Sequence, residues 1–243
     1  MSKKNRIRLY VNAELNVGSE IVCNEKQLHY LLNVMRLNVG DDVFVFNGKD
    51  GEFCTKIKTA QKKKCVLEVV AKFCEYCQSP DVWLLFALLK KDNTDLLVEK
   101  ATELGVRKIV PIISEYTSNS KTRTERLQTI AIEASEQCRR QDVPEVLPEV
   151  DLKKFLANWD KNRKLIYLDE SLKSLPCKEQ MPKCEAPVAI LTGPEGGFSE
   201  KELEFLRNLD YSYSISLGKR ILRAETASIC AIACWQAYSG DWQ

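Results

Sequence analysis

The stretch ILTGPEGGFSEKELEFL, residues 190–206, predicts the end of a strand, a glycine-rich turn and the start of a helix. An apolar run from Val188 to Leu191 precedes five residues, Gly193 to Gly197, that favour neither a strand nor a helix. Ser199 and Glu202 then have the spacing of a capping box, which opens a helix. Ligands of open parallel sheets bind beyond the carboxyl ends of strands, so the stretch indicates a fold class and a candidate site together.

From about residue 80 onward, predicted strands alternate with predicted helices. The other strands of this part are expected at Val82–Leu89, Lys108–Ile113, Leu165–Leu168 and Ser212–Leu217. The helices are expected after a cap at Asp92–Thr94 and before Gly105, at Thr124–Arg140, near Leu152–Trp159, after Ser199, and at about Leu222–Tyr238. This alternation predicts an α/β domain over residues 80–243, with a mostly parallel sheet and helices on both faces.

The first 74 residues have a different pattern, with short strands and tight turns. Strands are expected at Val43–Phe46, around Phe53–Ile57 and at Cys65–Ala71, with glycines suited to positive φ in the turn before Phe53. One helix is expected near Glu25–Met35, because its leucines have helical spacing. Residues 1–74 therefore predict a small β-barrel domain that precedes the α/β domain.

Composition excludes several classes of protein. The 243 residues are 44% hydrophobic and 29% charged, as in ordinary globular proteins, and no apolar run reaches the ~20 residues of a membrane span. We expect no secretory signal at the basic start of the chain. The ten cysteines are typical of reduced thiols in the cytosol, and His29 is the only histidine. The Cys74–Cys77 pair therefore lacks partners for zinc, and we expect no metal.

Charge is distributed unevenly along the chain. Residues 1–80 carry 13 Lys and Arg against 9 Asp and Glu, and the remainder carries 23 against 25. A basic small domain favours an anionic partner, although a solvated lysine-rich surface explains the charge equally well.

A second loop, Gly218–Thr226, also joins a strand to a helix and is rich in charge. Neither loop has a P-loop or G-x-G-x-x-G spacing, and Glu195 in the first loop disfavours phosphate, so a neutral or cationic ligand fits better. A tight turn and a surface salt bridge remain alternative explanations for the glycines and for the Arg and Glu residues.

The two loops together carry a family resemblance. LTGPEGGFSEKEL with LGKRILRAETA resembles the paired signatures of the SPOUT-class ribosomal RNA small subunit methyltransferase E family, which methylates uridine at N3. LLKKDNTDLLVEKATELGV, EASEQCRRQDVPEVLP and HYLLNVMRLNVGDDVFVFNGKDGEF are similar to further parts of that family, so the resemblance covers nearly the whole chain. Two departures are Ala224, where threonine is frequent, and Lys91, where glycine is frequent.

The resemblance implies a PUA-like RNA-binding barrel at 1–74 and a trefoil-knotted SPOUT domain at 80–243. It implies a homodimer that binds S-adenosylmethionine in the knot loops and ribosomal RNA, free or in the assembled small subunit. The cysteines favour a cytoplasmic location. The residues expected to bind the cofactor are Leu191, Thr192, Gly193, Pro194, Glu195, Gly196 and Gly197 in the first loop, and Leu217, Gly218, Arg220, Ile221, Leu222 and Ala227 in the second.

Methylation of uridine N3 requires that its proton be removed and the resulting anion stabilised. Arg223 is the candidate that stabilises the charge, and Glu225 is the candidate that accepts the proton or instead holds Arg223 in place. The target base must be unpaired, because N3 takes part in Watson–Crick pairing.

RNA phosphates are expected to meet the basic first domain. The candidate contacts are Arg6, Arg8, Arg36, Lys62, Lys63 and Lys64. Two alternatives keep the fold and change the function: a non-catalytic RNA-binding assembly factor, and a SPOUT enzyme with a different RNA target.

Overall fold

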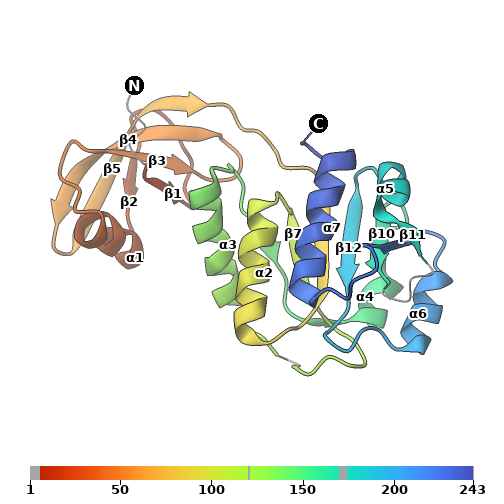
Figure 1. Cartoon of the computed structure of the whole chain (residues 1–243). Helices are drawn as coiled ribbons and strands as arrows, with labels where there is room; N and C mark the ends of the chain where they lie inside the picture. The colour runs from red at the N-terminus through yellow and green to blue at the C-terminus, as the bar shows by residue number, and fades with distance from the viewer. Residues whose placement is uncertain (1–5, 120, 170–173, 243) are drawn as a thin grey trace. The chain divides into compact units, whose positions relative to one another are not determined.

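The computed structural model describes residues 6–119, 121–169 and 174–242, and the chain divides into two compact units (Figure 1). Unit 1 comprises Met1–Gln78 and Ser135–Val143, and unit 2 comprises Ser79–Ala134 and Pro144–Gln243. The segment Ser135–Val143 lies within the predicted second domain but groups with unit 1. None of the helices in the described parts of the chain combines the length and hydrophobicity that crossing a bilayer requires.

Unit 1 is built on a curved five-stranded sheet (Figure 1). Its strands, in spatial order, are β1 (Arg8–Tyr10), β3 (Asp42–Phe46), β4 (Glu52–Gln61), β5 (Lys64–Cys74) and β2 (Glu20–Val22). β1 pairs in parallel with β3, and the other pairs are antiparallel. Alternate side chains such as Val43, Val45 and Leu67 are fully buried in one core, as period-2 alternation requires.

The predicted helix at residues 25–35 is two elements in the structure. α1 (Glu25–Leu28) begins at a capping box formed by Asn24 and Gln27, and a π-helix (His29–Val34) continues it. In the wider π turn the Met35 N–H donates to Tyr30 O, five residues earlier, at 2.9 Å. Met35, at the end of the predicted helix, is exposed.

Unit 2 contains a sheet in which every strand pair is parallel among the described residues. The strand order is β11 (Leu175–Pro176), β13 (Ser212–Ser216), β10 (Lys164–Leu168), β12 (Val188–Thr192), β6 (Val82–Ala87), β7 (Lys108–Ile113) and β8 (Glu145–Val146), and β9 (Val150–Asp151) also pairs with β7. The prediction of an α/β fold with a mostly parallel sheet is therefore confirmed.

Helices cover both faces of this sheet. The helices are α2 (Lys91–Glu103), α3 (Thr124–Cys138), α4 (Leu152–Ala157), α5 (Cys177–Gln180), α6 (Glu200–Arg207) and α7 (Ala224–Ser239), with a 3-10 turn at Met181–Lys183. α4 and α6 contribute Leu152, Leu156, Leu203 and Leu206 to the core on one face. α7 packs against β12 and beside α2, and Trp235 of α7 is fully buried (Figure 1).

Two helix starts differ from the predictions. α2 begins at Lys91 and has no side-chain cap, so the predicted cap at residues 92–94 was wrong. The Thr94 hydroxyl instead donates to Leu89 O at 3.1 Å, inside the first turn. α7 begins at Ala224, two residues after the predicted start, and Arg223 occupies its N-cap position. The predicted capping box at Ser199 and Glu202 is confirmed at α6.

Candidate functional site

Unit 2 holds a cavity of about 470 Å³ at the carboxyl ends of three neighbouring strands. Residues after β10, the loop after β12 and the loop after β13 all contribute to its wall. The structure thus brings together the two loops that the sequence singled out. The volume lies within the range of small-molecule sites, roughly 300–1,000 Å³.

Glycines give the two loops their shape. Gly197 has φ 72° and Gly218 has φ 105°, in the left-handed region that costs side-chain-bearing residues about 1–2 kcal/mol. Gly193 is favoured for a different reason, because a Cβ there would lie 3.1 Å from the Phe198 ring, which would have to shift by a few tenths of an ångström. The backbone of each loop can therefore approach a ligand without a side chain between them.

Buried polar contacts hold the ends of the loops in place. Ser228 Oγ of α7 lies 2.9 Å from Thr192 Oγ1 at the end of β12, and both residues are buried. At the other end of the first loop, the Glu202 carboxylate accepts the Ser199 N–H at 2.9 Å. The same carboxylate accepts the Glu115 N–H at 2.9 Å, so the connection after β7 is fixed to this loop as well.

Most residues predicted to bind the cofactor line the cavity. They are Thr192, Gly193, Pro194, Glu195, Gly197, Leu217, Gly218, Arg220, Ile221, Leu222 and Ala227. Arg223, a candidate catalytic residue, lines the cavity as well. Gly196 does not line it and lies on the exposed side of the loop. Leu191 does not line it either, because its side chain is fully buried in the sheet core.

The two candidate catalytic residues have different surroundings. Arg223 is exposed and lines the cavity from the N-cap position of α7. Glu225 is only 7% exposed, is not part of the cavity wall, and its Oε2 has no hydrogen-bond partner among the described residues. No ion pair joins Glu225 to Arg223 in the described parts of the chain, and whether Glu225 accepts the proton or holds Arg223 in place stays a prediction.

The end of β10 also contributes to the cavity, which was not predicted from the sequence. Leu168 and the buried Asp169 line the cavity, and Asp169 accepts a hydrogen bond from Ser174 Oγ at 3.0 Å. The rule that ligands bind beyond strand ends applied here too, since a strand was predicted to end at Leu168. No glycine or charge cluster marks this strand end, and it was therefore not chosen.

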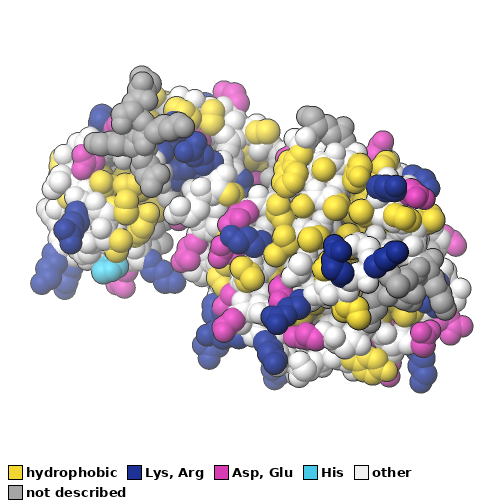
Figure 2. Space-filling model, in the orientation of Figure 1, with side chains coloured by type: hydrophobic (Ala, Val, Ile, Leu, Met, Phe, Trp, Pro, Cys, Tyr) yellow, Lys and Arg dark blue, Asp and Glu magenta, His cyan; other side chains and the backbone are white. Residues whose placement is uncertain are grey.

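Candidate RNA contacts in unit 1 fall into two groups. Arg36 and Lys62, Lys63 and Lys64 are exposed, the lysines at the turn between β4 and β5. Arg6 is also exposed, and its guanidinium lies over the rings of Phe44 at 4.4 Å and Phe73 at 4.0 Å. Figure 2 shows Lys and Arg side chains interspersed with Asp and Glu on the visible face, so charge alone does not mark a path for RNA.

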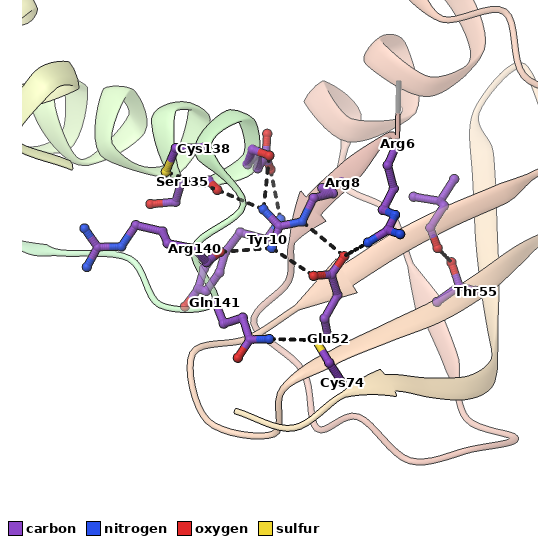
Figure 3. A network of polar contacts seen from close by, with 12 residues as sticks. Arg6, Arg8, Tyr10, Glu52, Thr55, Cys74, Ser135, Cys138, Arg140 and Gln141 are labelled. Carbon is purple, nitrogen blue, oxygen red and sulfur yellow. Dashed lines mark hydrogen bonds and ion pairs between the residues drawn. The ribbon is translucent and has the colours of Figure 1, made fainter. Parts of the chain in front are cut away.

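Arg8 has a structural role instead of the predicted RNA contact. It is 3% exposed, and its guanidinium donates to the Glu52 carboxylate from Nε at 3.1 Å (Figure 3). The same group donates to the carbonyl oxygens of Ser135, Glu136 and Arg140, at the end of α3 and just beyond it. These contacts occupy all three guanidinium nitrogens of Arg8 in the interior of unit 1. Arg8 is therefore not placed to contact an RNA phosphate.

Reduced cysteines and the absence of a metal site were predicted for the chain. All ten cysteines are free thiols. No group of three or more metal-ligating side chains occurs within the described ranges.

Comparison with known proteins defines the class first. Residues 77–236 match the family model of the RNA methyltransferase domain, and residues 22–70 match that of the RNA methyltransferase PUA domain. Fold, cavity and these matches define a PUA-containing RNA methyltransferase. Ribosomal RNA small subunit methyltransferase E of Rickettsia conorii is 34% identical over 229 residues, 93% of each chain. The chain belongs to the ribosomal RNA small subunit methyltransferase E family.

Two solved structures resemble the whole chain. The ribosomal RNA small subunit methyltransferase E of Neisseria gonorrhoeae, bound to S-adenosyl methionine, has a TM-score of 0.90 and 28% identity, and the match covers 98% of this chain and 100% of that one. A methyltransferase from Legionella pneumophila in complex with the cofactor SAM has a TM-score of 0.90, 30% identity and the same coverage.

Proposed function

We propose that this chain transfers a methyl group from S-adenosylmethionine to N3 of an unpaired uridine in small-subunit ribosomal RNA. The observation that carries the proposal is a cavity that both signature loops line together, with Arg223 in its wall. The family membership and the two similar structures with bound S-adenosylmethionine support the same function.

The cavity residues fit this cofactor. Positive-φ glycines expose backbone N–H and C=O groups that can hydrogen-bond an adenine edge, and Leu217 and Leu222 offer apolar surface for its faces. Glu195, which disfavours phosphate, is compatible with a cationic ligand. When bound, S-adenosylmethionine supplies an electrophilic methyl group.

Arg223 is assigned to the uracil. Removal of the N3 proton spreads negative charge onto O2 and O4, and a guanidinium in the cavity wall stabilises that charge. Arg223 stands at the N-terminus of α7, where backbone N–H groups also favour negative charge.

Glu225 is assigned to the proton. Its buried Oε2 has no partner among the described residues, and an unsatisfied buried acceptor costs about 1–3 kcal/mol. Because Glu225 is not part of the cavity wall, a substrate N–H would reach this oxygen through a bridging water.

The exposed cations of unit 1 are assigned to the RNA backbone. Arg36 and the Lys62–Lys64 turn offer point charges for phosphates, which position RNA without reading its sequence. The homodimer implied by the family resemblance and the cytoplasmic location expected from the reduced cysteines belong to the same proposal. Sedimentation of the purified protein at increasing concentration tests the dimer.

Substitution of Arg223 tests the proposed mechanism. Arg223→Ala should lower the rate of methyl transfer from tritiated S-adenosylmethionine to unmethylated small subunits by about 10²–10³-fold. Lys201→Ala, which removes an exposed cation from α6, serves as the matched control and should retain activity. An Arg223→Ala protein as active as the control would contradict the assignment, and an inactive wild-type protein would favour a non-catalytic RNA-binding factor.

A further inference from the structure

Tyr116 is an exposed aromatic side chain beside the cavity that none of the assignments above uses. It lies in the connection after β7 and is 53% exposed. A tight turn presents it: the Thr117 N–H donates to Ser114 O at 3.1 Å, and the Ser114 N–H donates to Thr117 Oγ1 at 2.9 Å.

This turn is attached to the first signature loop by a buried carboxylate. Glu202 is 4% exposed and accepts both the Glu115 N–H and the Ser199 N–H, each at 2.9 Å. Glu202 therefore links Glu115, which precedes Tyr116, to Ser199, which follows the first loop. Contacts within unit 2 thus set the position of Tyr116.

Tyr116 lies directly against that loop. A Cβ built on Gly196 would be 3.5 Å from Tyr116 Cβ and 4.0 Å from Cδ2. Gly196 itself stands between Glu195 and Gly197, which both line the cavity. The Tyr116 side chain thus packs against the loop that forms one wall of the proposed cofactor site, at a residue that does not itself line the cavity, and Tyr116 is half exposed.

The chemistry of N3 methylation restricts how the base can be held. The N3 edge must face the methyl donor, so hydrogen bonds along that edge cannot be the main means of binding the uracil. Its two faces remain free, and stacking on an aromatic ring is the usual way proteins bind unpaired bases. Lys121 and Arg123, both exposed in the same connection, add positive charge suited to the flanking phosphates.

We propose that Tyr116 is the stacking platform that positions the target uracil at the rim of the cavity. The inference rests on the proposed function and adds to it a residue that determines how the substrate is held. The aromatic face carries the interaction, and the phenol hydroxyl is dispensable.

Three substitutions test the role of the ring. Tyr116→Ala and Tyr116→Leu should lower kcat/KM for unmethylated small ribosomal subunits by about tenfold to a hundredfold, mainly through KM. Tyr116→Phe should stay within about twofold of the wild type. The Kd for S-adenosylmethionine, measured by calorimetry, should be unchanged in all three. Tyr238→Ala removes an exposed tyrosine far along α7 and is the matched control.

The outcomes separate this inference from the proposed function. A wild-type protein that binds no S-adenosylmethionine or transfers no methyl group refutes the proposed function and the inference with it. An active wild type with an equally active Tyr116→Ala or Tyr116→Leu variant refutes the stacking role alone. A Tyr116→Phe variant as impaired as Tyr116→Ala also refutes it. A Tyr116 variant with a changed sedimentation coefficient would identify Tyr116 as a contact between two copies of the chain, and this result would also refute the stacking role. If the alanine variant does not fold, the leucine variant decides.

Discussion

Single residues determine the shape of the proposed cofactor site. Gly197 has a positive φ and its neighbour Gly196 does not, so the two form a matched pair. Gly197→Ala should destabilise the loop by about 1–2 kcal/mol and weaken S-adenosylmethionine binding measurably in calorimetry. Gly196→Ala places a methyl at ordinary contact distance from Tyr116 and should leave the Kd nearly unchanged. Equal Kd values for the two variants would contradict this account of the loop.

Arg8 and Arg36 provide a second test at the scale of residues. Arg8→Met removes both hydrogen bonds from Arg8 to the buried Glu52 carboxylate and leaves it only the 3.9 Å ion pair with Arg6, which should cost about 3–5 kcal/mol in the free energy of unfolding. Arg36 is exposed, so Arg36→Met should leave stability unchanged and reduce the salt dependence of binding to unmethylated small-subunit RNA. Urea unfolding and filter binding measure the two effects. An Arg8→Met protein with wild-type stability would contradict the structural role.

The sequence predicted which loops form the site better than it predicted individual roles. The glycines and the charged residues located both loops, because glycines allow the backbone of a tight turn and charged residues mark a solvent-exposed loop. Leu191 was assigned to the ligand although its side chain is core, since the last residues of a buried strand and the first of a loop look alike in sequence. The buried, unpartnered Glu225 oxygen depends on three-dimensional contacts that no local pattern records.

At the scale of elements, one ion pair joins the starts of two strands of unit 2 that lie on either side of β12. Arg163, just before β10, donates to Asp81, just before β6, from Nη1 at 3.0 Å and from Nη2 at 2.8 Å. Its guanidinium also lies 3.8 Å from the centre of the Trp83 ring. Burial alone would raise the pKa of Asp81, but the hydrogen bonds and charge of Arg163 outweigh it and the pKa is lowered.

This lowered pKa gives a pH-dependent prediction. Asp81→Asn should reduce the free energy of unfolding at pH 7 by about 1.5–3 kcal/mol. Because the folded-state pKa is below the unfolded value, the contribution is present at neutral pH and is lost as pH falls below about 4. Urea unfolding at several pH values should therefore show the two proteins converging in acid. Asp210→Asn, an exposed control, should match the wild type throughout, and a constant gap for Asp81→Asn would contradict the argument.

Element types were predicted more accurately than element details. Alternation of apolar strands and amphipathic helices predicted the parallel sheet, because burial on both faces imposes that pattern. The π-helix at His29–Val34 was missed because six residues are too few to shift the apolar spacing visibly from that of an α-helix. The start of α2 was misplaced because a threonine that bonds the preceding turn resembles a capping residue.

At the scale of the whole molecule, long-range contacts decide what local patterns cannot. The segment Ser135–Val143 belongs to unit 1 because groups such as Ser135 O accept from Arg8, 127 residues earlier in the chain. Nothing in the composition of the segment separates it from the rest of the second domain. The knotted path and the homodimer stay predictions of the family resemblance.

The most direct test of the central claim is the position of the methyl group on the RNA. Unmethylated small-subunit RNA, free or in subunits, is incubated with purified protein and S-adenosylmethionine. Nuclease fragments of the RNA are then analysed by mass spectrometry, and the undigested RNA is analysed by reverse transcription. The account predicts one uridine with an added methyl on its base, and a reverse-transcription stop at that residue because N3 can no longer pair. A methyl group on ribose or on another base, or no methyl group at all, would contradict it.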